Sequence, residues 1–278
     1  MSPILRVASP LPGFGLGMGI LLAALTGVVL LPLAALLGQG LLMGPAEIAG
    51  HLAPARVRAA LLLSFRAALV ASLFNLVFGL ALAWVLTRYR FPGRRLIDAA
   101  VDLPFALPTA VAGIALTTLY APNGVFGQAL APLGISVAYT EAGIWLALVF
   151  VGLPFVVRTV QPVIDEIDPE WEEASATLGA SRLRTLRKVV LPVLTPSLLT
   201  GFALALARSV GEFGSVIFIA GNLPGKTEIA PLLIVIRLEE YSYDAAAAIG
   251  LAMLGISFAM LLFINATQVW TRRRIGHV

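Results

Sequence analysis

The most polar stretch of this otherwise apolar chain reads DEIDPEWEEASATLGASRLRTLRKVVLPVLTP, from Asp165 to Pro196. Its first part carries the signals of a helix start. Asp168 is a good N-cap residue, and Pro169 suits the first helical position. The helix dipole favours negative charge in the first turn. The residues that supply this charge are Glu170, Glu172 and Glu173. The sequence therefore predicts a helix that begins near residue 169.

An apolar stripe runs along this helix, and a glycine ends it. Trp171, Ala174 and Leu178 lie at positions i, i+3 and i+7, which brings them to one face. Gly179 can take the left-handed conformation that terminates a helix. We therefore predict a tight turn directly after Leu178.

A second short helix is predicted to follow the turn. Ser181 can cap it, and Pro192 and Pro196 mark the entry to the next apolar segment. Its basic residues are Arg182, Arg184, Arg187 and Lys188. The result is a helical elbow with an acidic half and a basic half. Lying on anionic lipid is the common role of a basic loop, but the carboxylates of the acidic half oppose it and suit a basic groove on a protein.

Composition puts the rest of the chain in a membrane. Of 278 residues, 59% are hydrophobic and 12% are charged, against about 45–50% and 25% in soluble domains. A spanning helix needs about 20 mostly apolar residues. Six segments qualify, at approximately 16–38, 62–86, 101–121, 140–161, 194–220 and 246–270. The expected fold class is an all-α membrane protein with six transmembrane helices in a single domain over residues 1–278.

Basic residues alternate between the loops. They gather at 88–95, at 182–188 and at 272–274, whereas 122–139 contains no Lys or Arg. By the positive-inside rule, both termini and the elbow are cytoplasmic, while 122–139 and 221–245 are external. Arg6 supports this assignment weakly, and Arg56 and Arg58 oppose it.

Several function classes find no support in the residues. The chain has no cysteine and two histidines, so disulfides, thiol catalysis and a thiolate or imidazole metal site are not expected. The basic residues sit beside apolar runs, so the net charge of +4 does not indicate a nucleic-acid partner. An intramembrane enzyme would need a catalytic cluster, and a secondary transporter would show two related halves with interrupted helices. Neither pattern is evident.

The elbow resembles the EAA loop of bacterial ABC importer permeases. The matching residues are Glu173, Ala174, Ser175, Gly179, Val189, Leu191 and Pro192. Ser175 replaces the second alanine of the family pattern, and Val189 replaces isoleucine. The resemblance implies a type I importer fold in which residues 165–196, between spans 4 and 5, form the coupling helix that docks on a cytoplasmic ATPase. Glu173 would meet a basic residue of that ATPase, Ala174 would allow close seating, and Gly179 would set the turn.

The same resemblance implies the surroundings of the chain. It would be a permease subunit of the bacterial inner membrane and not an enzyme. ATP and Mg²⁺ would bind the ATPase, in two copies, and this chain would bind no cofactor or metal. Its other partners would be membrane lipid, a second permease of the paralogous W type and a periplasmic binding protein for sulfate or thiosulfate.

Two further stretches resemble the T-type permease of sulfate/thiosulfate importers: Asp102 to Gly113 (DLPFALPTAVAG) and Arg208 to Glu240. Molybdate and tungstate permeases share much of this architecture, so another oxyanion is the alternative substrate. The residues that we interpret as candidates for the substrate path are Pro108, Thr109, Arg208 and Glu212.

These four candidates can also be explained by purely structural roles. The prolines of the third span can serve as kinks alone. Arg208 and Glu212, at i and i+4, can form a purely structural pair. Arg66 and Arg158 lie near span ends, where snorkelling would suffice for them.

The predicted topology is testable because the chain lacks cysteine. We expect a single cysteine at Ser136 to react with a membrane-impermeant thiol reagent in intact cells, and one at Ser181 to react only after permeabilisation. Labelling at position 181 but not at 136 would reverse the assignment.

Overall fold

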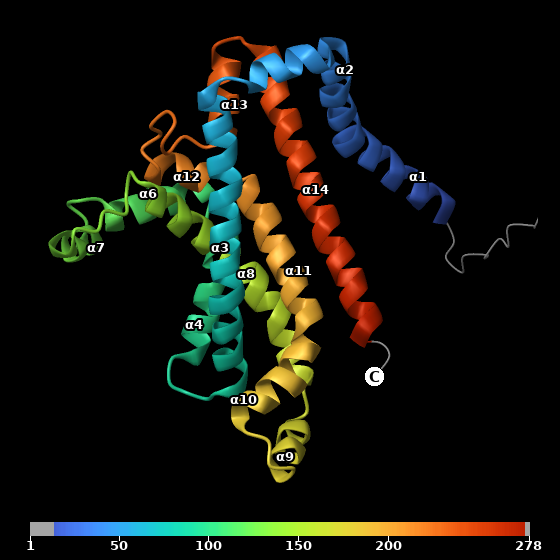
Figure 1. Ribbon diagram of the computed structural model, residues 1–278, viewed down its shortest axis with the longest axis vertical. Coiled ribbons are helices and arrows are strands. Elements are labelled where there is room, and N and C mark those ends of the chain that lie inside the picture. The colour runs from blue at the N-terminus through green and yellow to red at the C-terminus, as the bar shows by residue number, and fades with distance from the viewer. Residues whose placement is uncertain (1–13, 276–278) are drawn as a thin grey trace, which may run out of the picture.

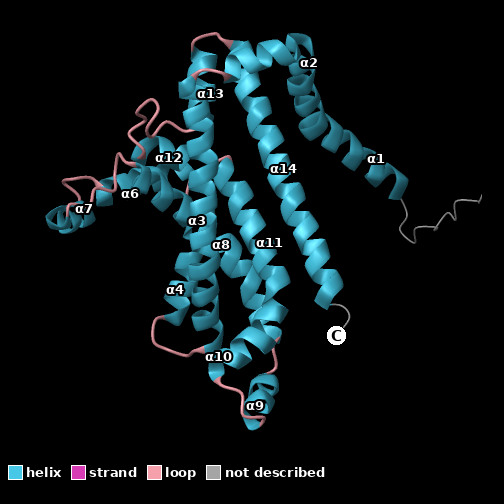
Figure 2. Ribbon diagram, viewed as in Figure 1, coloured by secondary structure: helices cyan, strands magenta, loops and turns pink. Residues whose placement is uncertain are grey.

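The computed structural model describes the backbone of residues 14–275 and the side chains of residues 14–268, and its described residues form helices and loops without a strand (Figure 2). Five helical segments are long and apolar enough to cross a membrane. They are Phe14–Leu52, Ala55–Arg88, Glu141–Glu166, Arg182–Val210 and Tyr243–Gln268. The remaining predicted span, the third at 101–121, is represented by a shorter apolar helix, Thr109–Tyr120. Arg6 and His277 lie outside the described residues, as do the side chains of residues 272–274.

Three helices form the centre of the molecule: α3 (Ala55–Arg88), α8 (Glu141–Glu166) and α11 (Leu191–Val210). Small residues on α3 allow the close approach, since Ala67, Ala68 and Ala71 are completely or almost completely buried. A Cβ on Gly79 would come within 2.9 Å of a Val156 side-chain carbon. Small residues at such contacts are typical of membrane helices, where association depends on packing because lipid is as apolar as the side chains.

The two ends of the bundle carry different connections (Figure 1). The turn between α3 and α4 (Arg94–Val101) and the elbow helix α9 (Pro169–Thr177) lie at one end. At the opposite end lie α13 (Ala230–Glu239) and the junction of α2 (Leu31–Leu52) with α3. The loops predicted to be cytoplasmic therefore share one end, and α13, from a loop predicted to be external, occupies the other.

The outer helices leave apolar side chains uncovered. α14 (Tyr243–Ile275) packs on α2, α11 and α13, whereas α1 (Phe14–Leu25) extends away from the bundle (Figure 1). No residue of α1 is buried. Burying this surface requires lipid or another protein chain, because contiguous apolar surface of this extent is not stable in water.

The first predicted span, 16–38, is the beginning of a longer helical segment. α1 passes through a π-helical stretch, η1 (Thr26–Leu30), into α2. α2 bends at Gly44, whose φ is +74°, before the chain reaches α3. A second π-helical stretch, η3 (Leu186–Val190), also ends at a Leu-Pro pair. Proline has no N–H to donate, and a π-turn is one way of accommodating it within a continuous helix.

The predicted third span at 101–121 is divided into several helices at its start, where its prolines lie. The chain forms α4, then α5 (Leu103–Ala106), and then α6 (Thr109–Tyr120). Leu107 is extended, with φ −89° and ψ +135°. The ring of Pro108 disfavours the α conformation at the preceding residue, which explains the break.

The prediction for 194–220 is wrong at both ends. Its helix begins earlier, because α10 (Arg182–Thr185), η3 and α11 follow one another without a break. It stops at Val210, and a separate short helix, α12 (Gly214–Ile219), follows after three residues. Within the predicted outer loop 122–139 the structure has α7 (Val125–Leu130) and the 3₁₀ turn η2 (Ala131–Leu133).

Candidate functional site

The elbow begins where the sequence predicts it. The Asp168 carboxylate accepts a hydrogen bond from the Glu170 N–H over 3.0 Å, and Pro169 is the first residue of α9. The cap satisfies one of the N–H groups that the first turn of a helix leaves without a partner. This bond fixes the direction in which the chain leaves α8.

Gly179 closes α9 by a Schellman turn. Its φ is +79°, its N–H donates to the Ala176 carbonyl, and the Ala180 N–H donates to the Ser175 carbonyl. These two bonds satisfy carbonyls that the last turn would otherwise leave free. Gly179 thus adopts the left-handed conformation that the sequence predicts for it.

The second half of the elbow differs from the prediction. α10 is not a separate short helix, because it continues through η3 into α11, which begins with Leu191 and Pro192. Ser181 occupies the N-cap position of α10, but its side chain makes no capping bond. The hydroxyls of Ser175 and Thr185 lie 2.8 Å apart and join α9 to α10. Motion of α9 is thus connected to a continuous helix that runs into the bundle.

The apolar stripe of α9 is not covered by any of the residues that the structure describes. Trp171 is 50% exposed and Leu178 is 88% exposed. Ala174 and the predicted contact residue Glu173 are also exposed. α9 buries none of its residues. An elbow that is held rigidly by its caps and presents an apolar stripe beside carboxylates can bind a groove that combines apolar and basic side chains.

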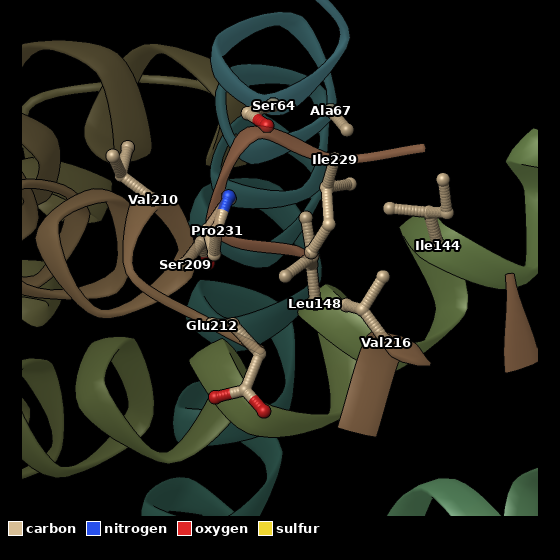
Figure 3. A pocket seen from close by; sticks show the side chains of 10 residues that line it. All are labelled: Ser64, Ala67, Ile144, Leu148, Ser209, Val210, Glu212, Val216, Ile229 and Pro231. Carbon is tan, nitrogen blue, oxygen red and sulfur yellow. The ribbon is translucent and has the colours of Figure 1, made fainter. Parts of the chain in front are cut away.

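A second group of polar side chains lies where α11 ends. Glu212 is 3% exposed, and its Oε1 accepts hydrogen bonds from the Ser215 N–H and hydroxyl. Its Oε2 pairs with Arg208 Nη1. Glu212, Ser64 and Pro231 line a small cavity of about 10 Å³. The Glu212 carboxylate points away from the other two residues (Figure 3). Both carboxylate oxygens are satisfied, so burial of this charge is compensated.

The start of α6 lies against this break. A Cβ on Gly214 would come within 2.2 Å of Thr109 Oγ1, and one on Gly113 would come within 2.4 Å of the Ser215 carbonyl oxygen. α6 and α12 therefore pack with their backbones in close approach. The structure thus gathers Thr109, which follows Pro108, and the Arg208–Glu212 pair around the interruption between Val210 and Gly214.

Two arginines that the sequence left to snorkelling are in fact paired. Arg66 binds the Glu141 carboxylate. Arg158 uses all of its N–H groups and binds the carboxylates of Asp98 and Asp102 at 2.6–2.7 Å, the Asp98 carbonyl and the Gln161 amide oxygen. Its guanidinium lowers the pKa of the Asp98 carboxyl, which lies on α4 outside the candidate spans. These bonds attach the interrupted third segment to α8.

Arg56, which opposed the positive-inside rule, also has a partner. It makes a bidentate pair with Glu228, at 2.8 Å and 2.7 Å, and Glu228 is 2% exposed. The charge of Arg56 is therefore neutralised locally, but the positive-inside rule counts basic residues and not net charge, so Arg56 and Arg58 still oppose it. No local sequence signal could have revealed this pair, because 172 positions separate its members.

Together, the helical bundle, the interrupted helices and the projecting elbow define a polytopic membrane protein whose elbow is exposed. Residues 75–277 match the family described as "Binding-protein-dependent transport system inner membrane component". The chain belongs to this family, and the predicted class is confirmed.

Individual relatives are similar over nearly the whole chain. The sulfate transport system permease protein CysT of Salmonella typhimurium is 53% identical over 268 residues, which are 96% of this chain and 97% of that protein. The protein of the same name from Escherichia coli is 52% identical over the same shares. A chain of the bacterial alginate ABC transporter, solved with its alginate pentasaccharide-bound periplasmic protein, superimposes with a TM-score of 0.75 at 18% identity and covers 94% of both chains. The predicted type I ABC importer permease fold is confirmed.

The geometry at the break predicts the effect of removing Arg208. We expect Arg208→Met to lower the thermal stability of the purified protein, because the buried Glu212 carboxylate loses its counter-charge. The loss should stay below the roughly 3–5 kcal/mol of a fully buried pair, since the Arg208 side chain is 33% exposed. Adding Glu212→Gln should restore part of the stability, as measured by thermal unfolding in detergent.

Arg237→Met is the matched control for this measurement. Arg237 pairs with Glu240, whose side chain is 48% exposed and stays hydrated when its partner is lost. An Arg208→Met protein as stable as this control would contradict the structural importance of the buried pair.

Proposed function

We propose that this chain is a membrane-spanning subunit of an ATP-driven importer for sulfate or thiosulfate, with α9 as the element that couples it to an ATPase. The single observation that carries the coupling role is the exposed stripe of Trp171, Ala174 and Leu178 on a helix capped at both ends. A rigid apolar face that the described residues leave uncovered is suited to binding another chain. The match to the EAA pattern supports the same residues.

The contact with the ATPase would use both chemical features of α9. The apolar stripe would enter a groove of the ATPase, and Glu173 would meet a basic side chain there. The ATPase, in two copies, would bind ATP and Mg²⁺ and perform the hydrolysis, so that this chain contributes no catalytic group. Leu191 and Pro192 would carry the movement of the elbow into α11.

The proposed substrate rests on the named relatives. Both are sulfate transport permeases, and each covers almost the whole chain at more than 50% identity. Thiosulfate is included because of the resemblance of Asp102–Gly113 and Arg208–Glu240 to the sulfate/thiosulfate permeases. The remaining partners of the proposal are a second permease of the W type and a periplasmic binding protein, with both termini of this chain in the cytoplasm.

We place the anion path beside the break at residues 211–213. Arg208 is one-third exposed, although its partner Glu212 is buried, so the guanidinium still offers N–H groups to an anion. Pro108 and Thr109 begin α6 next to Gly214, and the free N–H groups at a helix start favour negative charge. A path at this point would carry a charged substrate past hydrogen-bond donors instead of lipid.

Reconstituted uptake tests the function. We expect proteoliposomes that contain this chain, the second permease, the ATPase and the binding protein to accumulate radiolabelled sulfate and thiosulfate only with ATP, and to accumulate molybdate poorly. Uptake of molybdate alone would assign the chain to the alternative oxyanion. ATP-independent uptake would indicate a secondary transporter. Normal uptake by the double variant Arg208→Met/Glu212→Gln would remove these two residues from the path.

The turn at Gly179 provides a test of coupling. Gly179→Val should reduce copurification with the ATPase and abolish uptake, because a β-branched side chain is disfavoured at φ +79° and α9 would change direction. Ala180→Val is the matched control, since Ala180 has no such constraint. The turn lies outside the candidate spans, so both variants should be inserted at normal abundance. Normal uptake by Gly179→Val would exclude α9 as the coupling element.

A further inference from the structure

The side chain of Arg88 joins three helices at the elbow end of the molecule. Arg88 is the last residue of α3. Its Nη2 donates to the Ile167 carbonyl over 2.9 Å and lies 3.3 Å from Glu172 Oε1. Ile167 is the C-cap residue of α8, and Glu172 lies in the first turn of α9. One guanidinium therefore contacts the ends of α3 and α8 and the start of α9.

An aromatic ring also contacts the guanidinium. Its central carbon lies 5.5 Å from the centroid of the Trp84 ring, one turn earlier on α3. This is within the range of a cation–π contact, which a planar guanidinium favours. Only 20% of the Arg88 side chain is exposed. The arginine is thus partly desolvated, which strengthens its bonds to the carbonyl and the carboxylate.

Apolar packing does not hold α9 against α3. α9 buries none of its residues, and an open groove of about 580 Å³ lies between it and the end of α3, lined among others by Trp84, Tyr89, Glu172 and Ala176. Arg88 supplies an ion pair between α3 and α9 through Glu172. The orientation of the elbow relative to α3 therefore depends on a charged side chain.

We infer that Arg88 is a positioning residue for energy coupling: it holds α9 at a fixed angle to α3 and α8, so that displacement of α9 is transmitted to both helices. The inference rests on the proposed coupling role of α9. α3 and α8 pack together along the centre of the bundle, so a contact that engages both would move the core as a unit. Without it, α9 would still reach the ATPase through its own exposed face, but its movement would be lost at the junction.

The experiment compares Arg88→Met with the parent chain in the complete reconstituted importer. Two quantities are measured together: the rate of ATP hydrolysis and the rate of sulfate uptake. We expect the number of anions imported per ATP to fall by about tenfold, the order of magnitude expected from losing a hydrogen bond to a charged group. Abundance and copurification with the ATPase should remain normal, unlike in Gly179→Val. A purely structural role would lower abundance and leave the ratio unchanged.

Matched variants identify the contact. Glu172→Gln should lower the ratio, and the double variant with Arg88→Met should be no worse than Arg88→Met alone, because both remove one interaction. Arg90→Met is the control, since Arg90 is exposed and forms no ion pair among the described residues. Arg88→Lys should retain an intermediate ratio, as it keeps the charge but not the geometry of the fork. It also keeps the test usable if Arg88→Met fails to assemble.

Spin labels give a readout that is independent of transport. Cysteines at the exposed positions Arg90 and Glu170 report the distance between the α3–α4 turn and α9, and we expect a broader distance distribution in Arg88→Met. Absence of ATP-driven uptake by the parent importer would refute the proposed function. An unchanged transport ratio or an unchanged distance distribution in Arg88→Met, in an importer that otherwise works, would refute the role of Arg88.

Discussion

Backbone N–H and carbonyl groups within lipid need partners inside the protein, and this constraint shapes the whole structure. Helices satisfy it locally. The two interruptions, before Pro108 and after Val210, are harder to accommodate, and the structure brings the segments that follow them together. α6 and α12 approach so closely that Gly113 faces the Ser215 backbone and Gly214 faces Thr109. Breaks in the membrane helices are thus stabilised by packing against each other instead of facing lipid.

Charged side chains within lipid also lack water and need partners inside the protein. Glu212 and Glu228 are almost completely buried, and each is bound by an arginine. Arg158 donates all of its N–H groups to neighbouring oxygens. An unpaired charge would be costly at such positions. The contacts of Arg56 with Glu228 and of Arg158 with Asp98 and Asp102 connect segments that are distant in sequence, so the requirement to neutralise charge also affects how the helices are arranged.

Outside the candidate spans the constraint is relaxed, and the elbow is built differently. Caps at Asp168 and Gly179 define α9, and its apolar stripe remains uncovered. Such a helix is rigid in itself but weakly attached to the bundle, which suits an element that binds a partner. α9 is attached to the bundle through Arg88 and through the Ser175–Thr185 contact. In our proposal, these attachments determine how far a displacement of α9 by the partner is transmitted to the bundle.

The sequence by itself determined the class of protein, most of the spans and the elbow, because hydropathy, helix caps and a left-handed glycine are local signals. It could not locate the break after Val210, since nothing in the surrounding apolar run marks it as strongly as Pro108 marks the other break. Nor could it find the partners of Arg56, Arg88 and Arg158, because those bonds join residues between 56 and 172 positions apart. Only the tertiary structure decides such contacts, since they depend on which helices pack together and on which faces remain without water.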